Sequence, residues 1–233
     1  RRQPQGNGQL RFDPGQVFSI DLVDAVGKVV PVQVTEAERY NDKSFKRINA
    51  TFIERDVPSI GYKTYYAVPR KDSVIIPQLI MEQIETSFYK IIPDKGCVRS
   101  IFDKELNVEL LNAGKILGGD VFTMKSVGNG AGEFADVQQP EMEGFDKVSN
   151  YSPLWKTEMS GPVFTSIQMR QPVRNAVVET RLIVYNDLKR IDFETALLNW
   201  EGVLYREYRF ALPLNMKNGK VSYEVPFGVL EVG

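Results

Sequence analysis

The feature of this 233-residue sequence that most limits its fold is a hydrophobic period of two, which recurs along most of the chain. Phe18, Ile20 and Leu22 alternate with polar residues in FSIDLV, and RIDFETAL at 190–197 repeats the pattern. Side chains two apart share one face of a strand, so each segment predicts a half-buried strand of an antiparallel sheet. Further strands are predicted at 28–34, 48–55, 62–68, 86–92, 97–102, 120–125, 163–170, 176–185, 204–212 and 221–225.

Short clusters of Asp, Asn, Gly and Pro separate these segments, as expected of turns between strands. The cluster PDKG at 93–96, followed by CVRSIFD, predicts a hairpin with Gly96 in the left-handed conformation. The one helix-like stretch, 75–85, contains Pro77 and is interpreted as a linker at a boundary between two units. The sequence therefore predicts an all-β chain built of β-sandwiches.

Composition excludes several classes of function. The 29 basic and 30 acidic residues give a net charge of −1, so there is no basic field to bind a phosphate backbone, and no nucleic-acid partner is expected. The longest apolar run, VIIPQLIM at 74–81, is too short to span a bilayer, so no membrane segment is expected. The first residues show no apolar targeting segment. The cellular compartment stays undetermined.

The chain has no histidine and a single cysteine, Cys97. The usual general base, the Ser-His and Cys-His dyads and the commonest zinc ligand are therefore absent from it. No intrachain disulfide and no CxxC metal site can form. The apolar run GCVRSIF around Cys97 predicts a buried structural thiol.

The segment VGNGAGEFADVQQPEM at 127–142 interrupts the strand pattern. Its glycines do not form a dinucleotide fingerprint, because Glu133 stands where the third glycine is required and Pro140 stops any following helix. A calcium loop is a further alternative, although the carboxylates do not match the known register. Its oxygen donors would be Glu133, Asp136, Glu141, Glu143 and Asp146. The interpretation is a long surface connection at 126–160, of a kind that often borders binding sites.

Two other features have competing interpretations. Trp155 could be exposed and stack on a sugar ring, or it could pack back onto the sandwich as a core anchor, which is the commoner arrangement. Asp192 and Glu194 share the polar face of a strand, about 7 Å apart, a separation that two-carboxylate glycoside hydrolysis can use. Alternating charge on a solvated sheet face gives the same pattern more often, so no catalytic pair is assigned.

Four phrases of the sequence resemble one known family. ERDVPSIGYKTYYAV (54–68) resembles the segment that closes a small β-domain in family-38 glycoside hydrolases, the α-mannosidases. SFYKIIPDKGCVRSIFDKELNVELL (87–111) is similar to the start of that family's large C-terminal sandwich. RIDFETALLNWEGVLYREYRFALPLNM (190–216) and YEVPFGVLE (223–231) are similar to its core strands and its E-x-P-F/Y-G-x-x-E segment. The phrases follow the family's order and cover most of the chain.

The resemblance implies a small β-sandwich at 1–72, a linker at 73–84 and a large antiparallel sandwich at 85–233. The large unit would be part of a supersandwich related to galactose-mutarotase domains. In this family zinc and the catalytic residues belong to an N-terminal domain that this sequence does not contain, so no catalytic or metal-binding residue is assigned here. The resemblance further implies that this chain packs on that domain, and that the whole protein hydrolyses terminal α-mannosides in mannose-containing glycans.

On this basis the loop at 127–156 is predicted to face the catalytic domain and to help wall its sugar cleft. The candidate sugar contacts are Glu133, Asp136, Gln138, Gln139 and Trp155. The family often has an Asp- and Trp-rich loop here, and because this chain departs from it, no contact is carried over residue by residue. An exposed docking face would make the chain self-associate when it is separated from its partner.

Two alternatives stay open. The chain could be a free-standing carbohydrate-binding or adhesion module, or a mutarotase-like enzyme in its own right. The second ranks lowest because its usual chemistry needs a histidine acid or base, and the chain has none.

Overall fold

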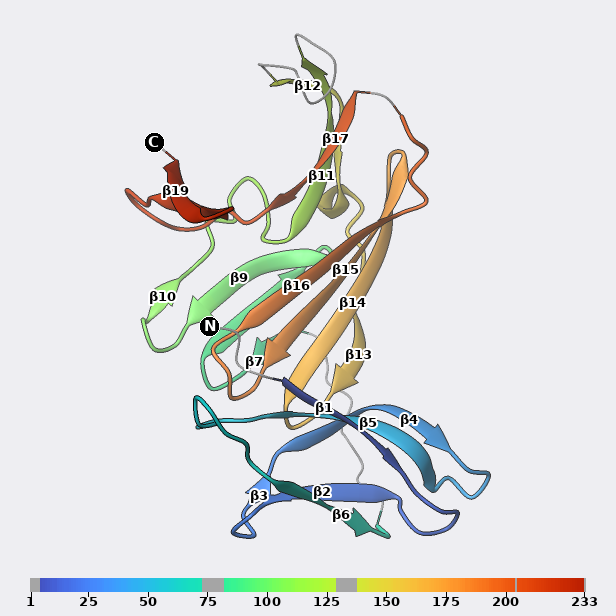
Figure 1. Ribbon diagram of the computed structural model, residues 1–233. Coiled ribbons are helices and arrows are strands. Elements are labelled where there is room, and N and C mark those ends of the chain that lie inside the picture. The colour runs from blue at the N-terminus through green and yellow to red at the C-terminus, as the bar shows by residue number, and fades with distance from the viewer. Residues whose placement is uncertain (1–4, 73–81, 129–137, 204, 233) are drawn as a thin grey trace.

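The computed structural model describes residues 5–72, 82–128, 138–203 and 205–232, and it is built almost entirely of β-strands (Figure 1). The helical structure within these ranges is one 3-10 turn, η2 at Val148–Asn150. The all-β prediction is therefore confirmed. Within the described ranges, no helix has the length and apolar character needed to cross a bilayer.

Residues 5–70 form two three-stranded antiparallel sheets that face each other as a small sandwich. One sheet has the order β1-β5-β4, with strands Gln5–Arg11, Phe45–Ile53 and Val32–Arg39. The other has the order β3-β2-β6, with strands Val29–Val30, Ser19–Asp24 and Tyr65–Arg70. The core between them is apolar and consists of Val17, Ile20, Phe45, Ile48 and Ala50.

Residues 84–232 form four further antiparallel sheets. The first has the order β10-β9-β8-β7, with strands Val108–Glu109, Cys97–Asp103, Tyr89–Asp94 and Ile84–Glu85. The second has the order β13-β14-β15-β16, with strands Lys156–Ser160, Phe164–Val173, Ala176–Tyr185 and Ile191–Leu198. The third has the order β12-β11-β17, with strands Gln138–Lys147, Asp120–Gly128 and Arg206–Ala211. The fourth is a hairpin of β18, Val221–Val225, and β19, Gly228–Val232.

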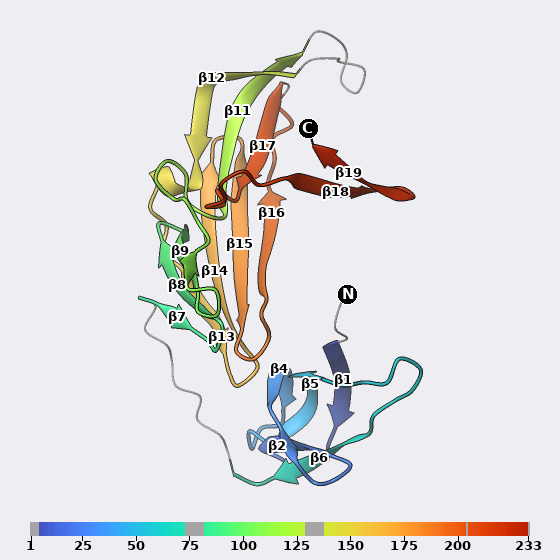
Figure 2. The same cartoon turned by 90° about the vertical axis from the view of Figure 1, so that its left-hand side faces the viewer.

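The main core lies between the β7–β10 sheet and the β13–β16 sheet, which Figure 2 shows packed face to face. Strand β15 shows how the sequence builds it. Val178, Leu182 and Val184 are fully buried on one face, while Glu179 and Arg181 lie on the other. A second apolar cluster, which includes Cys97 and Met169, extends the core toward β11 and η2. The period of two thus directs apolar side chains into the sandwich.

The predicted hairpin at PDKG is confirmed. Strands β8 and β9 pair from Asp94 and Cys97 outward, and Lys95 (φ 49°) and Gly96 (φ 69°) are both left-handed. Two left-handed residues between paired strands suit the right-handed twist of a hairpin. Gly96 is also sterically required, because a Cβ there would lie 2.4 Å from Cγ of Pro153.

The predicted connection at 126–160 is wrong in part. Residues 138–147 form β12, which pairs with β11, and residues 156–160 form β13, which pairs with β14. The polar segment QQPEMEGFDK lacks a clear apolar face because β12 is an edge strand exposed over much of its length. An edge strand also tolerates Pro140, whose nitrogen cannot donate to a neighbour.

Other strand boundaries differ from the sequence prediction for local reasons. The strand predicted at 28–34 is divided at Pro31 into β3 and β4, since proline has no backbone N–H to continue a ladder. The polar strand β1 and the second half of the C-terminal hairpin, β19, have no prediction, because neither shows clear alternation.

The two sandwiches are joined by the side chain of Gln33 in β4. This residue is 2% exposed, and its Oε1 accepts hydrogen bonds from the backbone N–H groups of Val163 (3.1 Å) and Phe164 (3.0 Å). Gly161, in the same turn between β13 and β14, leaves room for the amide, since a Cβ there would lie 2.5 Å from Cδ of Gln33. The domain boundaries at 72 and 85 stay a prediction, because most of the linker lies outside the described residues.

Candidate functional site

Two of the five predicted sugar-contacting residues, Gln138 and Gln139, lie at the outer end of the β12-β11-β17 sheet. Gln138 and Gln139 begin β12, opposite Gly128 and Val127 of β11. Glu133 and Asp136 lie outside the described residues. The role of these four residues in sugar binding stays a prediction. The structure defines the two strand ends on either side of residues 129–137, namely Gly128 of β11 and Gln138 of β12.

Trp155 is not an exposed residue. Its indole is partly buried, packs against both apolar clusters of the large unit, and donates from Nε1 to the carbonyl oxygen of Cys97 at 3.0 Å. The structure therefore places Trp155 as the core anchor that the sequence also allowed. A contact between Trp155 and sugar stays a prediction that nothing here tests.

One basic side chain holds the first carboxylates of β12. Nζ of Lys125 in β11 lies 2.7 Å from Glu143 and 3.7 Å from Glu141. The hydrogen bond between Lys125 and Glu143 raises the pKa of the lysine and lowers the pKa of the glutamate. All three side chains are partly exposed, so the contacts fix the relative position of two strands more than they stabilise the protein.

Two arginines fix the middle of β12 at Gly144, Arg174 from the turn between β14 and β15 and Arg206 from β17. Its carbonyl oxygen accepts from Nε of Arg174 (2.8 Å) and from Nη1 of Arg206 (3.0 Å). Gly144 has a φ of 62°, and a Cβ on it would meet the Arg174 guanidinium at 2.5 Å. The positive φ favours glycine here, and a side chain at this position would displace the Arg174 guanidinium.

Two carboxylates, Asp146 of β12 and Asp120 of β11, accept hydrogen bonds near the C-terminal end of β12. Asp146 accepts from the Tyr151 hydroxyl (2.6 Å), which raises the pKa of that tyrosine, and from the Asn150 amide (3.2 Å). Asp120, fully buried in β11, accepts from the Ser149 hydroxyl (2.7 Å) and backbone N–H (3.2 Å). Buried carboxylates are stable only with such partners.

The network continues to Cys97, which is buried as predicted. Burial raises the pKa of its thiol far above the ordinary value, and the neighbouring Asp120 carboxylate raises it further. A thiol held protonated in this way is a poor nucleophile and a poor metal ligand. Cys97 is therefore a structural residue.

The calcium alternative gains no support from the described part of this region. Glu141 and Glu143 face Lys125, and Asp146 is engaged by Tyr151 and Asn150. Within residues 5–72, 82–128, 138–203 and 205–232, no group of three His, Cys, Asp or Glu side chains comes together as metal ligands.

Asp192 and Glu194, the pair considered for hydrolysis, each form an ion pair with an arginine side chain. Asp192 accepts from Nε of Arg190 at 2.6 Å and from the Tyr185 hydroxyl at 3.1 Å. Glu194 lies 3.3 Å from Nη1 of Arg181. These contacts fit the interpretation as a charged outer sheet face.

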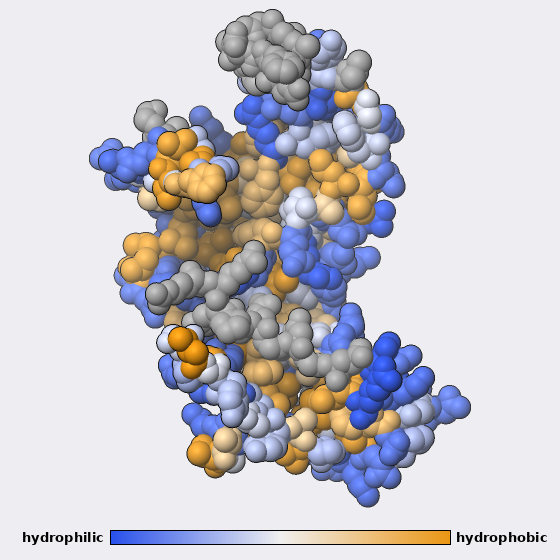
Figure 3. Space-filling model, viewed as in Figure 1, coloured by the Kyte–Doolittle hydropathy of each residue, from blue (hydrophilic) through white to orange (hydrophobic). Residues whose placement is uncertain are grey.

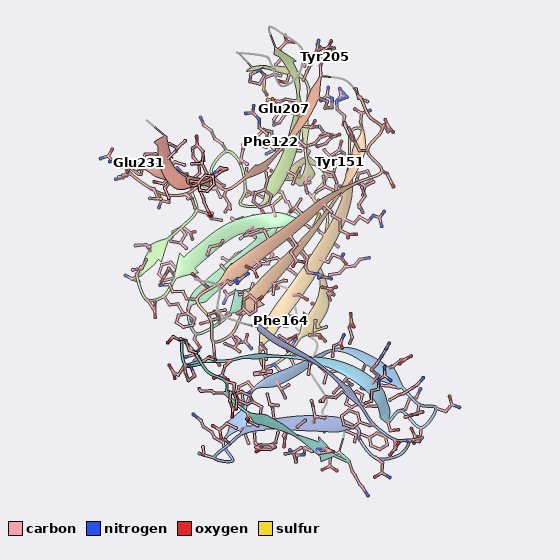
Figure 4. The ribbon with its side chains drawn as sticks, viewed as in Figure 1. Phe122, Tyr151, Phe164, Tyr205, Glu207 and Glu231 are labelled. Atoms are coloured by element: carbon pink, nitrogen blue, oxygen red, sulfur yellow. The ribbon has the colours of Figure 1, made fainter. Side chains whose placement is uncertain are left out.

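Sequence reasoning missed two exposed aromatic residues in the connection between β16 and β17. Trp200 is 59% exposed in the connection between β16 and β17, and Tyr205 is 66% exposed just before β17. The carbonyl oxygen of Tyr205 accepts from the backbone N–H of Ser126 at 2.7 Å, which places it beside β11 (Figure 4). The signal was available in NWEGVLY, but the alternation had assigned residue 205 to a strand that begins at Arg206.

A wide apolar surface covers the neighbouring elements. Figure 3 shows it in orange between the β18–β19 hairpin and strands β16 and β17. Exposed apolar side chains on these elements and the segment between them are Leu197, Phe210, Leu212, Leu214, Met216, Tyr223, Phe227, Val229 and Leu230. Contiguous apolar surface of this kind marks an interaction site.

The fold defines an antiparallel β-sandwich protein. The described polar groups of this region hold strands in place, and the apolar surface beside them is exposed to solvent. A family model described as the C-terminal domain of glycosyl hydrolases family 38 matches residues 84–232. The chain therefore belongs to glycosyl hydrolase family 38, which confirms the resemblance in the sequence and gives the chain a glycoside hydrolase context. A comparison of the chain with curated proteins gives no match.

Proposed function

We propose that this chain is a non-catalytic β-sandwich portion of an α-mannosidase-like glycoside hydrolase. It packs on a zinc-dependent catalytic domain of the same polypeptide and helps to wall that domain's sugar cleft. The whole protein removes terminal α-mannosyl residues from mannose-containing glycans. The observation that carries this proposal is the family match over residues 84–232, which covers nearly all of the large unit.

The open apolar face supports docking in cis. A two-stranded hairpin such as β18–β19 is marginally stable by itself in water, and here Phe227 at its turn is fully exposed. Burial of this hairpin and the face beside it against the catalytic domain would remove apolar area from water at about 25 cal/mol per Å². When that domain is absent, the same face would drive self-association of the chain.

The end of the β12-β11-β17 sheet supports a role at the edge of a sugar cleft. Trp200 and Tyr205 offer exposed aromatic faces with a polar edge, which suit the C–H faces and hydroxyl groups of a sugar. Tyr205 lies beside β11, the strand that ends at Gly128. In this role the chain's own residues would bind and orient the glycan.

The described residues do not form a zinc site. Zinc and the groups that break the glycosidic bond are assigned to the catalytic domain, and no step of the reaction is assigned to residues of this chain.

Two measurements test the proposal. The chain alone should release no phenol from an aryl α-mannoside, with or without added zinc, and turnover by the purified chain would overturn the assignment. In the whole protein, the double variant Gln138→Ala with Gln139→Ala should weaken binding of a mannoside inhibitor, while the matched control Gln83→Ala, at the opposite end of the large unit, should not. Equal affinities in both variants would remove the loop from the sugar site.

A further inference from the structure

The connection between β5 and β6, residues 54–64, presents two apolar side chains almost entirely to water. Ile60 is 98% exposed and Tyr62 is 86% exposed, with only Gly61 between them. Single exposed apolar residues are common on protein surfaces and need no partner. This pair differs because the loop that carries it, called here the 54–64 loop, is held in one shape by contacts at its base, near its tip and with the large unit.

The base of the 54–64 loop is closed by one lysine. Nζ of Lys63 lies 2.8 Å from Oε1 of Glu54 and also donates to the carbonyl oxygen of Arg55, so the two ends of the loop are joined. The Glu54 side chain is only 10% exposed, which shields this ion pair better than an ordinary surface pair. Nearer the tip the backbone folds back tightly, since a Cβ on Gly61 would lie 3.0 Å from Cβ of Pro58.

The same loop is attached to the large unit. Nη2 of Arg55 donates to the carbonyl oxygen of Asp187, in the turn between β15 and β16. That turn is held in its own unit, because the Asp187 carboxylate accepts from the Ser87 hydroxyl at 3.2 Å. A projection that is already ordered in this way loses little conformational freedom when a partner binds to it.

The 54–64 loop projects to the same side of the molecule as the β18–β19 hairpin. Both lie toward the left in Figure 1, where the loop is teal, and both lie toward the right in Figure 2. The hairpin carries the fully exposed Phe227 at its turn and belongs to the apolar surface of the large unit. Each sandwich therefore presents one apolar projection to the same side, where a single partner can receive both.

We propose that Ile60 and Tyr62 are docking anchors of the small sandwich and insert into an apolar pocket of the catalytic domain. The identity of this partner rests on the function proposed above. Tyrosine suits such a position, because its ring fills a pocket while its hydroxyl reaches the polar rim, and it is enriched among the residues that dominate binding energy.

Charge and shape argue against other partners. The 54–64 loop carries two acidic and two basic residues, so it has no net positive charge to attract an anionic membrane surface or a nucleic acid. In a two-fold dimer of this chain the same surface would meet itself. Two projecting tips that meet in this way bury little area, whereas a pocket in a different domain can enclose both side chains.

The first test compares the isolated chain with the whole protein. The double variant Ile60→Ser with Tyr62→Ser should leave the Tm of the isolated chain unchanged, because both side chains are in water there. It should lower the Tm of the whole protein, since two buried anchors are then lost. The matched control is Val26→Ser, an 88% exposed residue in the turn between β2 and β3, which should change neither Tm. An equal effect of the control would show a general apolar surface and overturn the inference.

A second measurement reports the burial of Tyr62 without any substitution. In hydroxyl-radical footprinting, Tyr62 should react several-fold more slowly in the whole protein than in the isolated chain. Tyr66 of β6, which is 56% exposed and lies outside the 54–64 loop, should react equally in both. Equal reaction of Tyr62 in the two forms would overturn the inference.

Phe227→Ser separates failure of this inference from failure of the proposed function. If Phe227→Ser lowers the Tm of the whole protein but not of the isolated chain, while the double variant lowers neither, the catalytic domain docks on the large unit alone. If neither variant distinguishes the whole protein from the isolated chain, the proposed docking fails as well. A lower Tm of the isolated double variant would show that Ile60 and Tyr62 pack within this chain or between its copies, which would also overturn the inference.

Discussion

Substitution of Gly96 by alanine tests how the β8–β9 hairpin packs against the segment after η2. Alanine would have to adopt a φ of 69°, and its Cβ would lie 2.4 Å from Cγ of Pro153 and 3.3 Å from Cγ1 of Val148. The left-handed conformation costs about 1–2 kcal/mol. Because the proline ring is rigid, the added carbon causes overpacking, which costs about 1–3 kcal/mol.

The expected loss in the free energy of unfolding is therefore about 2–5 kcal/mol. For a chain of this length, each kcal/mol corresponds to a fall in Tm of about 2–4 °C, so Gly96→Ala should lower Tm by on the order of 10 °C. The matched control is Gly202→Ala, because Gly202 has the same φ of 69° but no atom within 4 Å of its would-be Cβ. Its loss should be the backbone term alone, about 1–2 kcal/mol.

Thermal unfolding followed by circular dichroism measures both variants. The fall in Tm should be clearly larger for Gly96→Ala, and a further Pro153→Ala substitution should return part of the difference, since the two sites are in contact. If both single variants show the same Tm, or if Pro153→Ala returns nothing, the hairpin does not pack on Pro153 as described.

Three further outcomes follow from buried groups. Trp155→Phe should lower the free energy of unfolding by about 1–3 kcal/mol, because it leaves the Cys97 carbonyl without its indole donor; an unchanged urea midpoint would contradict this. Cys97 should resist iodoacetamide at pH 8 in the native protein and react fully in denaturant, and rapid native alkylation would show that the thiol is accessible. The pKa of Asp103 is lowered from 3.8, first by the Leu106 N–H and also by Lys189. Its contribution is therefore present above pH 3.8 and lost as the pH falls through the lower folded value, so Asp103→Asn should flatten the acid limb of a stability–pH profile, whereas an unaltered limb would exclude it.

The alternation in the sequence predicted most strands because packing and solvent impose it directly. It worked best where one face is buried and the other is partly exposed, as in β15. It failed for the polar edge strand β12, whose pairing depends on the arginines at Gly144 and on Lys125, contacts made by residues distant in the chain. The alternation within one segment carries no information about contacts between distant segments.

The candidate site was predicted less completely. Residue type alone does not determine exposure. The sequence analysis therefore listed Trp155, which is partly buried, as a sugar contact and did not list the exposed Trp200 and Tyr205. The resemblance to family 38 gave the context, and the chain's departure from the family's loop sequence left the individual contacts to be decided by structure. For Gln138 and Gln139 only the register is now known.

The shared amide of Gln33 makes the two sandwiches mechanically and thermodynamically dependent on each other. Unfolding of the small sandwich would remove the acceptor of two N–H groups of the large one, so the hydrogen bonds to Gln33 are lost in any state in which only one unit is folded. A substitution that removes this one amide would therefore be sensed in both units.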